Sequence, residues 1–192
     1  MTVLTQKSLK LTLAEFLQLP ETKPAGEYIE VKIYPKPMPQ GKHSTLQIRL
    51  TTAINRVAEP QQLAYAFPQL RCTFGGRSIV PDIAVFAWWR IPLNPEGEIE
   101  NRFTISPDWT IEILSPDQSE ARVIANILFC LDRGTSLGWL IDPQAKLVIT
   151  FQPQQQPEVK QGRDILPVLP TIANWQLSVN ELFQWLSFNL PN

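Results

Sequence analysis

The sequence predicts an α/β domain with a central mixed β-sheet flanked by α-helices. Short runs rich in β-branched and aromatic residues, bounded by proline, glycine or serine, are typical of buried strands, and 79–86 and 109–114 are the clearest. Other stretches, such as 43–58, repeat apolar residues at the spacing of a helix that packs one face on a sheet.

Length and composition are those of a single globular domain spanning residues 1–192. Hydrophobic residues make up 44% of the chain and charged residues 18%. The formal net charge of -1 provides no global basic field, which argues against an indiscriminate nucleic-acid binder. A local basic groove remains compatible with this charge.

The two cysteines and the hydropathy profile point to the cytoplasm. Cys72 and Cys130 match no metal-ligand spacing, so we expect reduced thiols in the core. The sequence shows neither the basic-then-apolar N-terminal pattern of a signal peptide nor an apolar run long enough to span a membrane. We therefore expect neither export nor membrane insertion.

The N-terminal third begins with Thr12-Leu-Ala-Glu15, a capping box that predicts a short helix over 13–19. The apolar pattern at 27–34 predicts a strand or hairpin arm, closed by prolines at 35–39. A helix follows over 43–58, with Leu46, Leu50, Ile54 and Val57 on one stripe.

The middle of the chain predicts one or two strands over 63–73, then a turn at Gly75-Gly76 before the strand that carries Asp82. Residues 91–103 read as a long loop, which suggests a lid. Trp88-Trp89-Arg90 could form a platform for bases and phosphates. Anchoring of the strand end or an oligomer contact is the more common role of such aromatic residues.

The last third starts with Ser115-Pro116, which predicts a helix that begins there and runs to Arg133, with Gly134 as its stop. Strands are predicted at 137–142 and 146–152, joined by a type I turn. Gln154 to Gln156 fall in a surface loop, and Ser178 to Glu181 form a second capping box.

Asp82 and Glu112 each place an acid inside an apolar strand, where an ionised carboxylate is costly unless it is paired, hydrogen-bonded or bound to a metal. If the strands are neighbours, the carboxylates lie within roughly 5 to 8 Å of each other. A hard divalent ion, Mg²⁺ or Mn²⁺, is the simplest occupant between them. The alternative is that each acid is capped by backbone N–H groups or paired with arginine.

His43, the only histidine of the chain, lies at the start of the predicted helix on its apolar stripe. A single histidine at a helix start often only makes a local hydrogen bond, and the position also suits a catalytic role. Both interpretations are open at this point.

The order of these motifs resembles the Uma2 family of endonucleases, also called DUF820. Pro81-Asp82 before an apolar strand, Ile-Glu-Ile-Leu-Ser-Pro at 111–116 and Gly-Trp-Leu-Ile-Asp-Pro at 138–143 carry the resemblance, which runs from about Leu11 to Gln152. Lys-Pro-Met-Pro-Gln-Gly-Lys-His-Ser at 36–44 fits as well. The family is common in cyanobacteria and belongs to the PD-(D/E)XK superfamily, so the resemblance implies a restriction-endonuclease-like fold.

The resemblance also implies roles for particular residues. A His-Ser pair such as His43-Ser44 opens a helix near the site, and the two acids bind the metal. The superfamily's lysine would stand at Leu114, and the family places it instead on the next helix, where this chain has Asn126. Arg122 lies one turn earlier on the same face and suits a phosphate clamp. The family also has an acidic residue followed by glycine where this chain has Glu30-Val31.

Three functions are compatible with these features. The first is a magnesium- or manganese-dependent endonuclease acting on DNA, with Asp82, Glu112, Arg122, Asn126 and His43 as site residues. The second is a catalytically silent relative that binds nucleic acid or a protein partner. The third is a self-associating structural protein without metal. We also predict a homodimer, because Trp88, Trp89 and Trp185 offer more aromatic surface than one small domain covers.

Overall fold

A six-stranded sheet forms the centre of the computed structural model, which describes residues 11–116 and 118–188. Its strand order is β10-β9-β8-β7-β6-β3, and only the β7–β8 pair is parallel, so the predicted mixed sheet is confirmed. The strands are β3 (Ala64–Pro68), β6 (Ile83–Ala87), β7 (Trp109–Ile113), β8 (Leu137–Asp142), β9 (Leu147–Phe151) and β10 (Glu158–Gln161).

A smaller, four-stranded sheet has the order β2-β1-β5-β4. Its strands are β1 (Gly26–Ile29), β2 (Lys32–Pro35), β4 (Cys72–Phe74) and β5 (Arg77–Ile79). The β1–β2 hairpin turns through Glu30 and Val31, whose φ angles of 49° and 64° are in the left-handed region that glycine occupies most easily. The hairpin therefore forms without the glycine that the resemblance led us to expect there.

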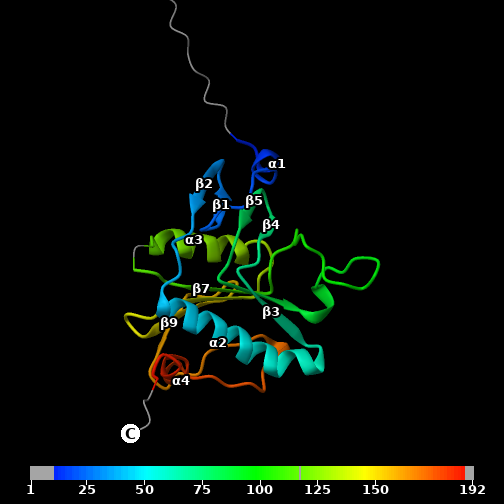
Figure 1. Ribbon diagram of the computed structural model, residues 1–192. Coiled ribbons are helices and arrows are strands. Elements are labelled where there is room, and N and C mark those ends of the chain that lie inside the picture. Colours follow the sequence, from blue (N-terminus) through cyan, green and yellow to red (C-terminus); the bar gives the residue numbers. More distant parts are fainter. Residues whose placement is uncertain (1–10, 117, 189–192) are drawn as a thin grey trace, which may run out of the picture.

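The described residues form four α-helices, of which the first lies beside the smaller sheet and the other three flank the large sheet (Figure 1). They are α1 (Leu13–Phe16), α2 (Gly41–Ala58), α3 (Glu120–Leu131) and α4 (Val179–Gln184), with three short 3-10 helices, η1 (Glu59–Gln61), η2 (Trp88–Arg90) and η3 (Pro170–Ile172). The helices α2 and α4 share a core with one face of the sheet, and α3 packs on β7 and β8 from the other face. The helices thus flank both faces, as predicted.

Strand alternation separates the two cores. Ile111 and Ile113 of β7 join the core beneath α2, whereas Ala84 and Phe86 of β6 join the core formed with the smaller sheet. Glu112 lies between two residues of the α2 core in the sequence, so its side chain leaves β7 on the opposite face. This is the face covered by α3 and by the hairpin of β1 and β2.

Both capping boxes are confirmed. The Thr12 and Ser178 side chains each accept a hydrogen bond from the backbone N–H three residues later, and the Glu15 and Glu181 carboxylates accept one from the backbone N–H of the cap residue. The predicted strands at 63–73, 137–142 and 146–152 and the turn at Gly75-Gly76 are also present. The strand β10 was not predicted, because its four residues are mostly exposed and lack an apolar alternation.

The predicted start of α3 is wrong. The helix begins at Glu120 with Ser119 as its N-cap, and not at Ser115-Pro116. Ser115 and Pro116 instead form a turn that Gln118 closes by donating its backbone N–H to the Ser115 carbonyl, 3.0 Å away. This loop holds Gln118 and Ser119 beside the acids rather than inside a helix.

The lid interpretation of 91–103 is also wrong. This loop leaves the end of β6 opposite to Asp82, and none of its residues lines the pockets next to the acids. In the adjoining 3-10 helix, Arg90 pairs with Asp108 at 2.6 Å and Trp88 is half-buried, which supports anchoring of the strand end. Trp89 is 80% exposed, but Trp185 packs on the core, so the homodimer stays a prediction that rests on less surface.

Two further expectations concern the cysteines and the membrane. Cys72 and Cys130 are both free and buried, as predicted, and burial raises the pKa of Cys72 to about 12. Across the described residues, every helix is too short or too polar to span a bilayer.

Candidate active site

Asp82 and Glu112 meet across neighbouring strands. In the antiparallel β6–β7 pair, Ile83 is opposite Ile111 and Ala84 is opposite Thr110, which places Asp82, just before β6, against Glu112. Their exposed fractions are 2% and 3%. The predicted juxtaposition of two buried acids is therefore present.

Lys36 lies between the two carboxylates. Its Nζ donates to Asp82 Oδ1 at 2.9 Å, to Glu112 Oε2 at 3.1 Å and to the Val80 carbonyl at 2.7 Å. An ammonium group has three N–H donors, so all of them are used. No local pattern predicted this contact, because Lys36 follows β2 and is 46 residues from Asp82 in the chain.

His43 contacts the same acid from the first turn of α2. Its Nε2 lies 3.0 Å from Asp82 Oδ2, and this hydrogen bond requires the proton on Nε2. Its Nδ1 is buried and has no hydrogen-bond partner in the described structure. One turn later, Gln47 Nε2 donates to the Asp82 backbone carbonyl at 2.7 Å. The start of α2 is thereby fixed on Asp82, and His43 belongs to the site.

The environment of Asp82 favours its ionised form. Burial by itself would raise the pKa of its carboxyl group. The Lys36 charge, the hydrogen bond from His43 and the backbone N–H of Ile113 at 2.8 Å outweigh burial and hold the pKa well below the ordinary value. Asp82 thus has the backbone capping of the alternative interpretation and is paired with a cation, whereas its role as a metal ligand stays a prediction.

The environment of Glu112 instead disfavours its ionised form. Burial and the nearby charges of Asp82 and Glu27 raise the pKa of Glu112 well above its ordinary value, although Lys36 acts against this shift. For Lys36, burial would lower the pKa of its amine, but Asp82, Glu112 and Glu27 together hold it above its ordinary value. The site thus keeps Asp82 and Lys36 charged and makes the ionisation of Glu112 costly.

Glu27 is a third buried acid of the site, with an exposed fraction of 5%. Its Oε1 accepts the backbone N–H of Val80 at 2.9 Å, and its Oε2 accepts from Asn126 Nδ2 at 3.2 Å. Sequence reasoning missed Glu27. The signal that identified Asp82 could have found it, because Glu27 also lies in a fully buried strand, β1.

Asn126 and Arg122 lie on the same face of α3, as predicted, but they differ in burial and in the residues that they contact. Asn126 is buried against Glu27, and its Oδ1 has no hydrogen-bond partner in the described structure. Arg122 is exposed, and its guanidinium carbon lies 4.2 Å from the centre of the Tyr34 ring. Arg122 pairs with no carboxylate among the described residues, so its N–H donors are available to a ligand.

Two pockets reach the acids of the site. One, of about 290 Å³, is lined by His43 and Asp82, and the other, of about 340 Å³, is lined by Glu112, Arg122 and Asn126. Lys36 lines both. The acids, the lysine and the arginine therefore border a common open region.

The oxygens around Lys36 Nζ also suit a hard cation. Two carboxylates and a backbone carbonyl already surround one positive charge there, and oxygen donors of this kind are the ligands that Mg²⁺ and Mn²⁺ prefer. No group of three His, Cys, Asp or Glu side chains in the described ranges is arranged to hold a metal. A divalent ion would thus depend on Asp82, Glu112 and Val80 O, with water completing its shell.

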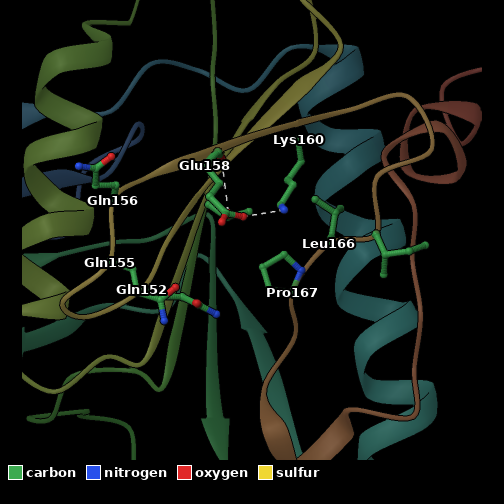
Figure 2. Close-up of a pocket in the computed structure, with 9 residues that line it drawn as sticks. Gln152, Gln155, Gln156, Glu158, Lys160, Leu166 and Pro167 are labelled. Atoms are coloured by element: carbon green, nitrogen blue, oxygen red, sulfur yellow. Dashed lines mark hydrogen bonds and ion pairs between the residues drawn. The ribbon is translucent and has the colours of Figure 1, made fainter.

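A separate pocket beside β9 and β10 has a different character (Figure 2). It measures about 190 Å³ and is lined by the side chains of Gln152, Gln155 and Gln156. Its lysine, Lys160, is already paired with Glu158 at 2.6 Å. The pocket is polar, but Lys160 and Glu158 neutralise each other and Glu158 is exposed to solvent. It therefore lacks the buried, closely spaced charges found around Asp82.

Comparisons with known proteins agree with this geometry. The family model described as "Uma2: Putative restriction endonuclease" matches residues 13–180. A similar solved structure is described as a "putative nuclease belonging to DUF820 from Anabaena variabilis ATCC 29413". It is 56% identical, covers 92% of this chain and 99% of its own, and superposes with a TM-score of 0.90. The search of curated proteins found no match.

The family model covers nearly the whole described fold, including β1, β6, β7 and α3 of the site. The structural likeness extends to the mixed sheet and its flanking helices, which is the restriction-endonuclease-like arrangement that the motifs predicted. The chain therefore belongs to the Uma2 family.

Proposed function

We propose that this protein is a magnesium- or manganese-dependent endonuclease that hydrolyses phosphodiester bonds of DNA. The observation that carries the proposal is the pairing of Asp82 with Glu112 on neighbouring strands, around a bound positive charge and beside two open pockets. Strongly shifted pKa values in a cleft are typical of catalytic sites. Membership of a family described as "Putative restriction endonuclease" supports the same reaction class.

Hydrolysis of a phosphodiester requires an activated water and neutralisation of the charge that develops on the phosphoryl oxygens. A divalent cation held by Asp82 and Glu112 would supply both effects. The hydrogen bonds from His43 and from the Ile113 N–H fix the orientation of the Asp82 carboxylate. Asp82 is thereby held in one geometry before the substrate arrives, which lowers the cost of reorganisation.

The cationic side chains suit a phosphate backbone. Arg122 is stacked on Tyr34 at the edge of the larger pocket, and its guanidinium can donate two parallel hydrogen bonds to a phosphate. Asn126 lies deeper, and its free Oδ1 can accept a hydrogen bond from a water. We assign Arg122 to substrate binding and Asn126 to positioning.

The test is a digest of plasmid and of labelled oligonucleotides with Mg²⁺ or Mn²⁺, with EDTA as the metal-free control. We expect slow cleavage that depends on metal and is abolished in Asp82→Asn. An RNA oligonucleotide of the same sequence serves as the competing substrate. Absence of cleavage under all of these conditions, from protein that is folded by circular dichroism, would contradict the proposal.

The silent-relative function is supported by one specific observation. Asn126 stands where the resemblance places a lysine, and the Lys36 ammonium already contacts both carboxylates of the acid pair. A protein that binds DNA in a gel-shift assay through Arg122, but does not cleave it with either metal, would fit this second function.

A further inference from the structure

Lys36 occupies the position that a divalent ion would need. Its ammonium is held by the Asp82 and Glu112 carboxylates and by the Val80 carbonyl, at 2.9, 3.1 and 2.7 Å. Its side chain is only 12% exposed. A divalent cation bound to the same oxygens at about 2.1 Å would lie in contact with this ammonium, and the two positive charges would repel each other. Lys36 and the metal therefore exclude each other.

The charge of the cluster favours a more highly charged cation than Lys36. Two carboxylates, from Asp82 and Glu112, contact one ammonium, and a third acid, Glu27, lies close enough for its charge to act on Lys36. The cluster carries an excess of negative charge when all three are ionised. Lys36 thus neutralises the cluster only in part.

The backbone at Lys36 is stiff, whereas its side chain can move. Pro35 and Pro37 flank the residue, and proline fixes one backbone dihedral and restricts the residue before it. The side chain borders both pockets of the site, of about 290 and 340 Å³. Rotation about the side-chain bonds of Lys36 can therefore carry the ammonium from the carboxylates into open space without a change of the fold.

We propose that Lys36 is the resident cation of the Asp82–Glu112 pair and that a divalent ion binds by exchange with it, which releases the ammonium to a phosphate oxygen of the bound strand. This exchange adds a step to the proposed nuclease function. Only the contact of the displaced lysine with a phosphate rests on that function. It predicts that metal binds weakly to the free protein. Because a bound phosphate stabilises the displaced lysine, metal and DNA strengthen each other's binding.

The first experiment compares Mn²⁺ binding, by isothermal titration without DNA, in the wild type, in Lys36→Met and in Lys42→Met. Methionine keeps the length and packing of the stem but removes the charge. Lys42 is an exposed residue of α2 that contacts neither acid, so its variant controls for the change in net charge. We expect the Kd for Mn²⁺ to fall at least tenfold in Lys36→Met and to change less than twofold in Lys42→Met. A Kd in Lys36→Met that equals or exceeds that of the wild type overturns the proposal.

Lys36→Met leaves two facing carboxylates without their cation, so this variant could unfold. A second measurement therefore uses the wild type, with an amine-reactive reagent and mass spectrometry to follow each lysine. Without metal, burial and hydrogen bonding protect Lys36, whereas Lys32 and Lys42 are exposed. We expect saturating Mg²⁺ to raise labelling of Lys36 several-fold and to leave Lys32 and Lys42 unchanged. Equal labelling of Lys36 with and without bound metal overturns the exchange.

These outcomes are separable from those of the cleavage assay. Tighter Mn²⁺ binding in Lys36→Met from a protein that never cleaves DNA supports the exchange and refutes the nuclease. Metal-dependent cleavage by the wild type, together with unchanged Mn²⁺ affinity in Lys36→Met, supports the nuclease and refutes the exchange.

Discussion

The two ends of β6 each join an acid to a cation, and they differ in how completely the charges are matched. At the far end, Asp108 accepts from Arg90 at 2.6 Å and from the Ala87 N–H at 2.7 Å, one cation for one acid. At the near end, Lys36 contacts both Asp82 and Glu112, one cation for two acids, and the charge of Glu27 lies nearby. The matched pair needs no ligand, whereas the unmatched cluster stores unfavourable charge that a ligand can relieve.

The largest expected difference between the two ends of β6 appears when one carboxylate charge is removed at each end. We expect Asp82→Asn to lower the rate of metal-dependent DNA cleavage by at least about 10²- to 10³-fold, because it removes a carboxylate at the reacting phosphate. We expect Asp108→Asn to retain cleavage and to lower the free energy of unfolding by about 1 to 3 kcal/mol. Cleavage rates and chemical denaturation measure the two effects. Equal rates in the two variants would show that the ends of β6 do not differ in function.

Stability should depend on pH in opposite ways for the two facing acids. Asp82 has a lowered pKa when folded, so it stabilises the fold above its ordinary value of 3.8 and this contribution is lost as pH falls. Glu112 has a raised pKa when folded, so it binds more protons in the folded state and stability decreases as pH rises above 4.5.

In EDTA at pH 7, we therefore expect Asp82→Asn to destabilise the protein by about 3 to 5 kcal/mol, because it breaks a buried charge pair. We expect Glu112→Gln to be more stable than the wild type at pH 7 and nearly equal to it at pH 4. Urea denaturation across this pH range is the measurement. A Glu112→Gln variant that is less stable than the wild type at pH 7 would contradict the raised pKa.

Adding a second cation should make the two ends of β6 more alike. Asn126→Lys places an ammonium beside Glu27 and the larger pocket, and we expect it to raise DNA cleavage on the order of tenfold by offsetting transition-state charge. Ala125→Lys adds the same charge on an exposed position of α3 and serves as the matched control. Cleavage in Asn126→Lys no higher than in Ala125→Lys would refute a catalytic use of this position.

The smallest expected effect concerns the rim of the site. Arg122→Ala should weaken DNA binding and cleavage by a few-fold to about tenfold, because one charge-assisted phosphate contact is lost. Arg163→Ala removes the same charge from an exposed position outside the pockets of the site and should leave both unchanged. Gel-shift titration and initial rates measure the two variants, and similar losses in both would indicate only a general effect of net charge.

The sequence predicted those parts of the site that depend on local pattern. Asp82 and Glu112 were identifiable because an acid within an apolar strand is costly, and the β6–β7 register then sets them face to face. His43 and Arg122 could be placed because helical spacing fixes which face each of them occupies.

The rest depends on long-range contacts that no local pattern encodes. Lys36 reaches Glu112 across 76 residues of sequence, and Glu27 meets Asn126 across 99. Both contacts arise because the β1–β2 hairpin folds over the end of β6, which depends on the pairing of β1 with β5. The start of α3 was mispredicted for a local reason, since Ser115 and Ser119 are both residues that favour an N-cap position, and the helix begins after Ser119, whose side chain makes no cap hydrogen bond.

The most direct test of the central claim is a crystal structure of the wild type soaked in Mn²⁺, with anomalous diffraction to locate the metal. The account predicts a manganese peak between Asp82 Oδ1 and Glu112 Oε2, with Lys36 Nζ moved from these oxygens into the adjoining pocket. A crystal with saturating Mn²⁺ that shows no peak there and Lys36 still bound to both carboxylates would contradict it.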